Sequence, residues 1–321
     1  MLNRFVNKVK LIMVLALILL VFNTTAFAGE WTNTKENIKF WNEYPFAGTI
    51  FSWDGAKDAE NYANGKGKLT TYIDNEVIEV FSGNMKKGKF QGKATIDIVG
   101  IVIYEGNVVD SKMHGKGSLI WSNGDSYSGQ WQAGMQNGKG IYTWADGTVY
   151  EGDFVNNERT GKGKISWTTG DSYDGSVVKG LRVGYGVYKW KNGDVYSGQW
   201  ANGQQNGKGV YKWQDGTVYE GDFINDARTG KCKITWKTGD YYTGDIVNGV
   251  QEGKGFFKWN DGTTYDGDWV NGYLHGYGII KWPNGDVYEG EFAYGLMDGY
   301  GIYTYSDGYV EEGYWLNGEP I

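Results

Sequence analysis

The chain has 321 residues, 17% of them aromatic, with 52 glycines, 3 prolines and a single cysteine. Its formal net charge is −7 and it lacks a basic block, which argues against nucleic acid as a partner and against simple electrostatic attachment to anionic lipid. Because Cys232 is the only cysteine, an intramolecular disulfide is excluded.

The first 28 residues have the parts of a secretory signal peptide. Arg4, Lys8 and Lys10 form a basic region, residues 11–22 are apolar, and a small-x-small cleavage signal ends at Ala28. The apolar run is too short to span a bilayer comfortably. We therefore expect cleavage near Ala28 and a secreted, cell-surface or periplasmic mature chain. Retention as an uncleaved anchor is the competing interpretation.

Residues 29–52 do not follow the pattern of the rest of the chain. They are rich in aromatic residues, which is unlike a solvated tail. The end units of a stacked repeat array need a covered face. We therefore interpret residues 29–52 as an N-terminal cap.

Residues 53–321 follow a period of 23 residues, and a fixed period in this range indicates a repeat architecture. The units are degenerate over 53–103, regular over 104–310, and end in a half-repeat at 311–321. An aromatic residue opens each unit, at Phe81, Tyr104, Tyr127, Tyr150, Tyr173, Tyr196, Tyr219, Tyr242, Tyr265 and Tyr288.

Each unit predicts two β-strands. With the opening aromatic as position 0, apolar residues and glycines fall at positions 0, 2, 4 and at 11, 13, 15, 17, with mostly polar residues between them. This period of two is typical of strands with one aromatic and one polar face. A three-residue loop after Trp144 would pair Tyr142 with Tyr150 and keep Trp144 on their face, and Gly147 suits its left-handed end.

The same parity predicts the pairing inside a repeat. Position 4 would face position 11, and position 2 would face position 13, so each ring at position 4 would face glycine on both sides. Gly207→Val should then clash with Trp200 and Phe223. A packing role for Gly-x-Gly also weighs against a nucleotide-binding loop, which must open a helix.

On the polar face this pairing predicts exposed cross-strand ion pairs. Such pairs are worth a few tenths of a kcal/mol each, so they describe a solvated face and no site. The expected pairs are Asp153 with Lys162, Asp222 with Lys231, Glu151 with Lys164 and Glu220 with Lys233.

At these residues the chain resembles the MORN repeat family. Residues 265–287 show the pattern most clearly, with Tyr-x-Gly-x-Trp, Gly-x-Gly and Trp-x-Asn-Gly in succession, and the resemblance covers residues 53–321. It implies an all-β fold, an elongated single-layer antiparallel meander of tandem 23-residue β-hairpins without helices after the signal peptide. It also implies scaffolding, dimerisation and attachment to partners or membranes.

Few residues suggest chemistry. His114 and His275 hold equivalent loop positions many repeats apart, and Cys232 replaces a glycine at position 13, where a small buried residue is expected. A calcium-binding row is conceivable at Asp125, Asp171, Asp194, Asp240 and Asp286, but the ligand-rich spacing of known calcium loops is absent. We therefore predict no catalytic, cofactor-binding or metal-binding residues, and no enzyme. An enzyme with a site near residues 29–83 is the least favoured alternative.

The aromatic face is the predicted binding surface, since a single sheet has no second layer to cover it. We expect a scaffold that attaches to protein or membrane lipid, with a cell-wall or glycan-binding array as the alternative and a homodimer contact as a further option. The candidate residues are Trp121, Trp131, Trp144, Tyr150, Trp167, Trp190, Trp200, Trp213, Tyr219, Trp236, Trp259, Trp269 and Trp282.

Overall fold

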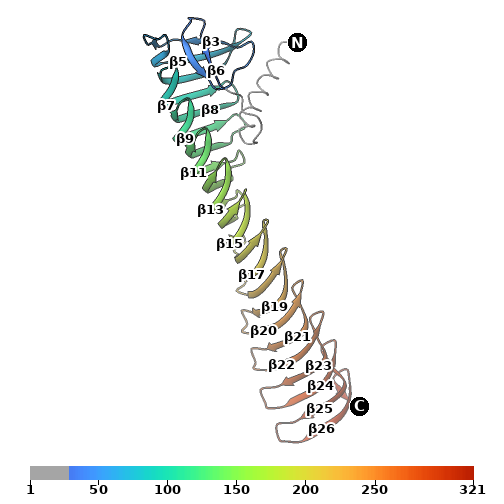
Figure 1. Ribbon diagram of the computed structural model, residues 1–321. Helices are drawn as coiled ribbons and strands as arrows, with labels where there is room; N and C mark the ends of the chain where they lie inside the picture. Colours follow the sequence, from blue (N-terminus) through green and yellow to red (C-terminus); the bar gives the residue numbers. More distant parts are fainter. Residues whose placement is uncertain (1–28) are drawn as a thin grey trace. The chain divides into compact units, whose positions relative to one another are not determined.

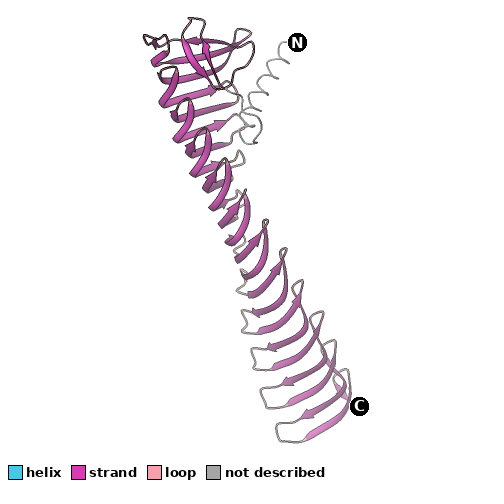
Figure 2. Cartoon of the chain, viewed as in Figure 1, coloured by secondary structure: helices cyan, strands magenta, loops and turns pink. Residues whose placement is uncertain are grey.

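The computed structural model describes residues 29–321, which form strands and turns without a helix (Figure 2). Within this range no helix could therefore cross a membrane. The predicted signal peptide, residues 1–28, lies outside the described residues.

The strands alternate between the two segments expected in each repeat. Their bounds are β1 Glu30–Asn33, β2 Lys39–Asn42, β3 Ile50–Trp53, β4 Ala56–Lys57, β5 Ala63–Ile73, β6 Glu76–Lys86, β7 Lys89–Ile98, β8 Val102–Val109, β9 Lys112–Trp121, β10 Ser126–Gln132, β11 Met135–Thr143, β12 Val149–Val155, β13 Glu158–Ser166, β14 Ser172–Val178, β15 Leu181–Lys189, β16 Val195–Ala201, β17 Gln204–Lys212, β18 Val218–Ile224, β19 Ala227–Thr235, β20 Tyr241–Val247, β21 Val250–Lys258, β22 Thr264–Val270, β23 Tyr273–Lys281, β24 Val287–Ala293, β25 Leu296–Thr304, β26 Val310–Leu316 and β27 Glu319–Pro320.

The chain divides into two compact units. The first runs to Thr168 and includes Val177–Gly180, and the second holds Thr169–Ser176 and Leu181–Ile321. In the first, β5 to β13 pair antiparallel in chain order, β3 also pairs with β5, and β1 and β2 form a separate two-stranded sheet. In the second, β15 to β27 pair in chain order in the same way (Figure 1). The predicted all-β antiparallel meander of hairpins is confirmed in each unit.

The three-residue loop is also confirmed. Tyr142 faces Tyr150 in the register, and the Trp144 N–H donates a 2.9 Å hydrogen bond to the Thr148 carbonyl. Gly147 has a φ of 89°, as the left-handed end of this loop requires. The same bond joins Trp213 to Thr217 in the second unit.

The opposite end of each hairpin is a tighter turn, which the sequence analysis left unassigned. Positions 6 and 7 both have positive φ, for example 49° and 68° at Asn156 and Asn157, and 50° and 86° at Asn248 and Gly249. Two left-handed residues in a two-residue loop define a type I′ turn, for which Asn-Gly and Asn-Asn are suitable sequences.

A β-bulge in each repeat overturns part of the predicted register. Gly152 faces Gly163 as expected, but Phe154 faces Arg159 and not Gly161. Gly161, with a φ of 83°, lies in the extra segment that shifts the pairing by two residues. The expectation that each position-4 ring faces glycine on both sides is therefore wrong. Phe154 faces glycine only on the preceding strand, at Gly138.

The bulge also removes two of the predicted ion pairs. Lys139 Nζ lies 2.7 Å from Asp153, so this pair joins consecutive repeats, whereas Asp153 receives only the backbone N–H of Lys162. The predicted Asp153–Lys162 and Asp222–Lys231 pairs are therefore wrong. The other two predicted pairs, Glu151 with Lys164 and Glu220 with Lys233, do face each other in the register.

The ring that covers the glycines is the opening tyrosine. A Cβ built on Gly209 would lie 2.5 Å from Cε2 of Tyr196, and one built on Gly198 would lie 2.5 Å from its hydroxyl. The Tyr196 hydroxyl donates to the Gln199 carbonyl at 2.8 Å. A buried tyrosine therefore lies over two facing glycines in the regular repeats, except that Cys232 replaces one of them opposite Gly221.

The predicted reason for the glycine at Gly207 is wrong, although a glycine is still required. Its φ is 98°, and a Cβ there would meet Oε1 of Gln199, while Trp200 and Phe223 are not among its nearest neighbours.

In the irregular first repeat, an indole ring takes the place of the tyrosine ring. The Trp53 ring covers Gly55 and Gly67, and its Nε1 donates to the Ala56 carbonyl at 2.7 Å.

Candidate binding surface

The structure separates the thirteen predicted aromatic residues into two groups. Five belong to the core and expose 5% or less of their surface: Trp131, Tyr150, Trp200, Tyr219 and Trp269. The indole N–H groups of this core are satisfied by the sheet itself, since Nε1 of Trp200 donates to the Gly186 carbonyl at 3.2 Å. A ligand lying on the sheet reaches little of these rings.

The other eight are half-buried and hold position 17, one per repeat. We call them the tryptophan row: Trp121, Trp144, Trp167, Trp190, Trp213, Trp236, Trp259 and Trp282. In the repeats where position 15 is aromatic, its ring contacts neighbouring members of the row. Tyr211 lies 5.1 Å from Trp190 and 4.6 Å from Trp213, measured between ring centroids. Within each compact unit, accessible aromatic surface is therefore arranged along the three-residue loops.

Arginines at position 9 add positive charge to the aromatic face. The Arg159 guanidinium lies 4.7 Å from the Trp144 ring centroid, and that of Arg228 lies 4.8 Å from Trp213. Burial lowers the pKa of Arg159, which nevertheless remains charged at neutral pH. The sequence analysis missed these residues. Alternation already places position 9 on the aromatic face, but the bulge that sets Arg159 opposite Phe154 leaves no mark in the period-two pattern.

The aspartates considered as a calcium row bind within the protein. Asp171 accepts a 3.0 Å hydrogen bond from the Tyr188 hydroxyl and a 2.8 Å bond from the Lys191 N–H. Asp125 does the same with Tyr142 and Ala145, at 2.8 Å each. Each of these carboxylates accepts hydrogen bonds from the following repeat, so the aspartates recur with the spacing of the repeats.

The cysteine and the possible metal-binding side chains were the other candidates for a reactive site. Burial raises the pKa of the half-buried Cys232 thiol to about 12, so the nucleophilic thiolate is disfavoured at neutral pH. Within residues 29–321 no group of three or more His, Cys, Asp and Glu side chains is arranged to hold a metal ion.

The fold and this surface define a tandem array of β-hairpin repeats that presents a regular side-chain row in each unit. The MORN repeat model matches nine consecutive segments of 104–126, 127–149, 150–172, 173–195, 196–218, 219–241, 242–264, 265–287 and 288–308. The chain therefore belongs to the MORN repeat family. It is a repeat-based binding or scaffold protein, and repeats of this family are generally non-catalytic.

Comparison with solved structures gives only distant likenesses. The TCP10 domain of Danio rerio CPAP, in complex with a STIL peptide, is 13% identical with a TM-score of 0.40, covering 74% of this chain and 99% of that one. The SAS-4 TCP domain of Drosophila melanogaster is 11% identical with a TM-score of 0.29, covering 55% and 83%. These scores carry no argument about function. No curated protein matches the chain.

Proposed function

We propose that this protein is exported and acts as a non-catalytic scaffold that holds an extended partner along the tryptophan row. The regular placement of one half-buried tryptophan per repeat supports this proposal. Within each compact unit, neighbouring members stand two strands apart, about 9.6 Å, so each repeat offers an equivalent contact. A partner that follows these contacts is extended or repetitive.

The chemistry of the row favours a polypeptide partner. Tryptophan, tyrosine and arginine, the side chains enriched in protein interfaces, alternate there. A cell-wall glycan is less suited, because Arg159 and Arg228 already lie over the faces of Trp144 and Trp213 that would stack on a sugar. A membrane is less suited because these rings are half-buried and do not protrude.

Cosedimentation tests this proposal. The purified protein is mixed separately with cell-envelope protein, lipid vesicles and purified cell wall, and bound fractions are compared for Trp144→Ala, Trp213→Ala and the double variant. Tyr185→Ala is the matched control, because Tyr185 is 60% exposed on the polar face. Loss of envelope-protein binding in the row variants alone supports the proposal. Wall or vesicle binding that depends on the row would replace the polypeptide with that partner.

A truncation series tests whether contacts are spread along the row. Removing three repeats at a time from the C-terminus should lower affinity progressively, as equivalent contacts are lost. Each truncated chain must retain its β circular dichroism for the comparison. Unchanged affinity followed by complete loss at one step would contradict the proposal and indicate a single discrete site.

Export is tested independently by N-terminal sequencing of the protein from outside the cell membrane. The expected first residue is Gly29. Recovery of the exported protein with Met1 retained would show that the segment is an anchor.

A further inference from the structure

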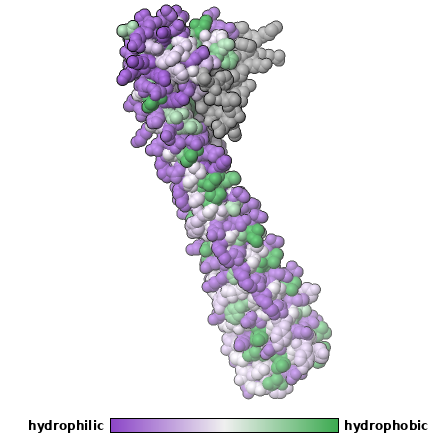
Figure 3. Space-filling view, viewed as in Figure 1, coloured by the Kyte–Doolittle hydropathy of each residue, from purple (hydrophilic) through white to green (hydrophobic). Residues whose placement is uncertain are grey.

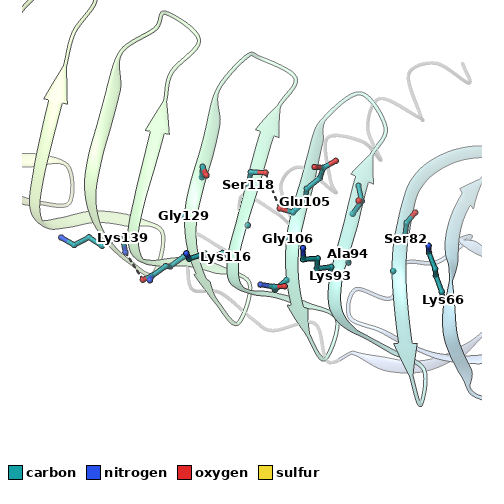
Figure 4. A pocket seen from close by; sticks show the side chains of 16 residues that line it. Lys66, Ser82, Lys93, Ala94, Glu105, Gly106, Lys116, Ser118, Gly129 and Lys139 are labelled. Carbon is teal, nitrogen blue, oxygen red and sulfur yellow. Dashed lines mark hydrogen bonds between the residues drawn. The ribbon is translucent and has the colours of Figure 1, made fainter.

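A groove runs along the polar face of the first unit, on the side of the sheet opposite the tyrosine core. Its volume is about 1020 Å³, and its floor is the bare backbone at Gly106, Gly117 and Gly129 (Figure 4). Cβ atoms added at these positions would point toward the tyrosine rings, so the polar face shows only backbone there, between the flanking rows of polar side chains. The visible surface of the first unit is largely hydrophilic (Figure 3).

Lysines form one wall of this groove. Lys66, Lys93, Lys116 and Lys139 stand on β5, β7, β9 and β11, and all four are exposed (Figure 4). Since they occupy alternate strands, successive ammonium groups are about 9.6 Å apart along one line. We call Lys66, Lys93 and Lys116 the lysine line.

The lysine line faces neutral side chains. In the register Lys66 lies opposite Asn84, Lys93 opposite Asn107, and Lys116 opposite Gln130. The next lysine, Lys139, instead faces Asp153 and forms an ion pair of 2.7 Å with it. In the second unit the equivalent lysines all have aspartate partners at 2.7 Å, in the pairs Lys208–Asp222, Lys231–Asp245 and Lys254–Asp268.

The opposite wall supplies hydroxyl groups. Ser82, Thr95, Ser118 and Ser128 line it, together with one carboxylate, Glu105. Hydroxyl donors beside ammonium groups are suited to anionic oxygens. The part of the chain that holds this groove is also the less acidic part. Residues 29–168 carry 15 basic and 17 acidic side chains, whereas residues 169–321 carry 13 and 21.

We infer that this groove binds a flexible linear polyanion, one whose anionic groups repeat along an unbranched chain. A line of like charges at even spacing in a groove matches such a polymer better than it matches a planar membrane. Nucleic acid is disfavoured because no aromatic side chain lines the groove, so bases would find no stacking platform. This surface is separate from the tryptophan row.

A groove of the same kind in the second unit provides an internal control. It has a volume of about 510 Å³ and includes Lys208 and Lys231, which Asp222 and Asp245 neutralise. The design of the test follows from this difference. Aspartate at the positions of Asn84, Asn107 and Gln130 would neutralise the lysine line with the side chain that the other repeats already use.

The experiment measures binding of long-chain inorganic polyphosphate to the purified protein by calorimetry. The triple variant Asn84→Asp/Asn107→Asp/Gln130→Asp should bind at least about tenfold more weakly, and Glu105→Gln should bind more tightly. Lys208→Gln/Lys231→Gln should bind as the unaltered protein does. Raising salt from about 50 to about 200 mM should weaken binding by about 20- to 40-fold, since three contacts release counterions.

Thermal melting of the triple variant shows whether it is folded, and a Lys66→Gln/Lys93→Gln/Lys116→Gln variant gives a second route to the same loss of charge. Unchanged polyphosphate affinity in both folded variants would overturn the inference. So would equal affinity for orthophosphate, for single-stranded DNA or for anionic vesicles, because each would replace the linear polyanion with a different ligand.

Discussion

The carboxylate of Asp194 accepts a 2.9 Å hydrogen bond from the Tyr211 hydroxyl, 17 residues later in the chain. Its other oxygen accepts the Gln214 N–H at 2.8 Å. Asp194 is only 8% exposed, so both bonds form largely out of water. One side chain thereby joins the loop of one hairpin to the strand and the loop of the next.

The two residue types at this contact change together from repeat to repeat. Where position 21 is aspartate, position 15 of the next repeat is usually tyrosine, and where it is threonine, that position is isoleucine. The aspartate pairs are Asp125 with Tyr142, Asp171 with Tyr188, Asp194 with Tyr211 and Asp286 with Tyr303, and Asp240 with Phe257 is the exception. The threonine pairs are Thr148 with Ile165, Thr217 with Ile234 and Thr263 with Ile280.

A double-mutant cycle should therefore show coupling at this pair. Tyr211→Phe should destabilise the fold by about 1.5 kcal/mol, because a part-buried hydrogen bond to a charged acceptor is lost. Asp194→Thr should cost a similar amount. The double variant Asp194→Thr/Tyr211→Ile should be more stable than the sum of the single losses by about 1 kcal/mol. Denaturant unfolding measures all three, and additive losses would show that the two residues act independently.

Acid should weaken these contacts. Burial works to raise the pKa of Asp194, but the Gln214 N–H and the Tyr211 hydroxyl outweigh it and hold the pKa below its ordinary value of 3.8. A depressed carboxylate pKa contributes stability that is present above pH 3.8 and is lost as pH falls below it. Unfolding midpoints should therefore drop steeply on acidification, and less steeply in Asp194→Asn. Equal slopes in both proteins would contradict this assignment.

Alkali should unfold the array through its core tyrosines. Burial raises the pKa of Tyr150 from 10.0 to about 12, and the same cause acts on Tyr104 and Tyr127. The stability that follows from a raised pKa is complete below pH 10 and is lost as pH rises through about 12. Exposed tyrosines contribute the first rise in tyrosinate absorbance, and the final rise, from the buried rings, should coincide with loss of the far-ultraviolet circular dichroism signal. Ionisation of these tyrosines near pH 10 with the β signal intact would contradict a buried position.

The tyrosine-covered glycines should tolerate no side chain. Gly209→Ala places a Cβ 2.5 Å from the Tyr196 ring and should cost about 1–3 kcal/mol through overpacking. Gly313→Ala is the matched control, because Glu311 replaces the opening tyrosine in that half-repeat and nothing lies within 4 Å of the added Cβ. Thermal melts should separate the two variants. Equal melting temperatures would show that the ring can move away.

Gly207→Val should also destabilise the protein strongly, for a different reason. A branched residue at a φ of 98° is strained, and its Cβ would displace the Gln199 side chain. Gln199→Ala would remove the clash while leaving the backbone strain. Thermal melting should therefore show only partial recovery in Gln199→Ala/Gly207→Val, and full recovery would mean that the strain is negligible.

The sequence by itself determined the architecture of the repeats. A period of 23 residues, alternation of aromatic and polar residues, and Asp-Gly or Asn-Gly loops define paired strands, their facing and the three-residue loop, as Trp144 and Thr148 confirm. These features are local, because each depends on the conformational preferences of adjacent residues and on strict parity along a strand.

Only the tertiary structure decided which side chains meet. The bulge at Gly161 shifts Phe154 onto Arg159 and takes Lys162 out of register with Asp153, and parity cannot predict this because a two-residue shift keeps every side chain on its face. The same shift brings the arginines over the tryptophan row. Trp200 is buried and Trp190 is half-buried, although both occupy the same face in the sequence pattern. Packing between strands decides this difference.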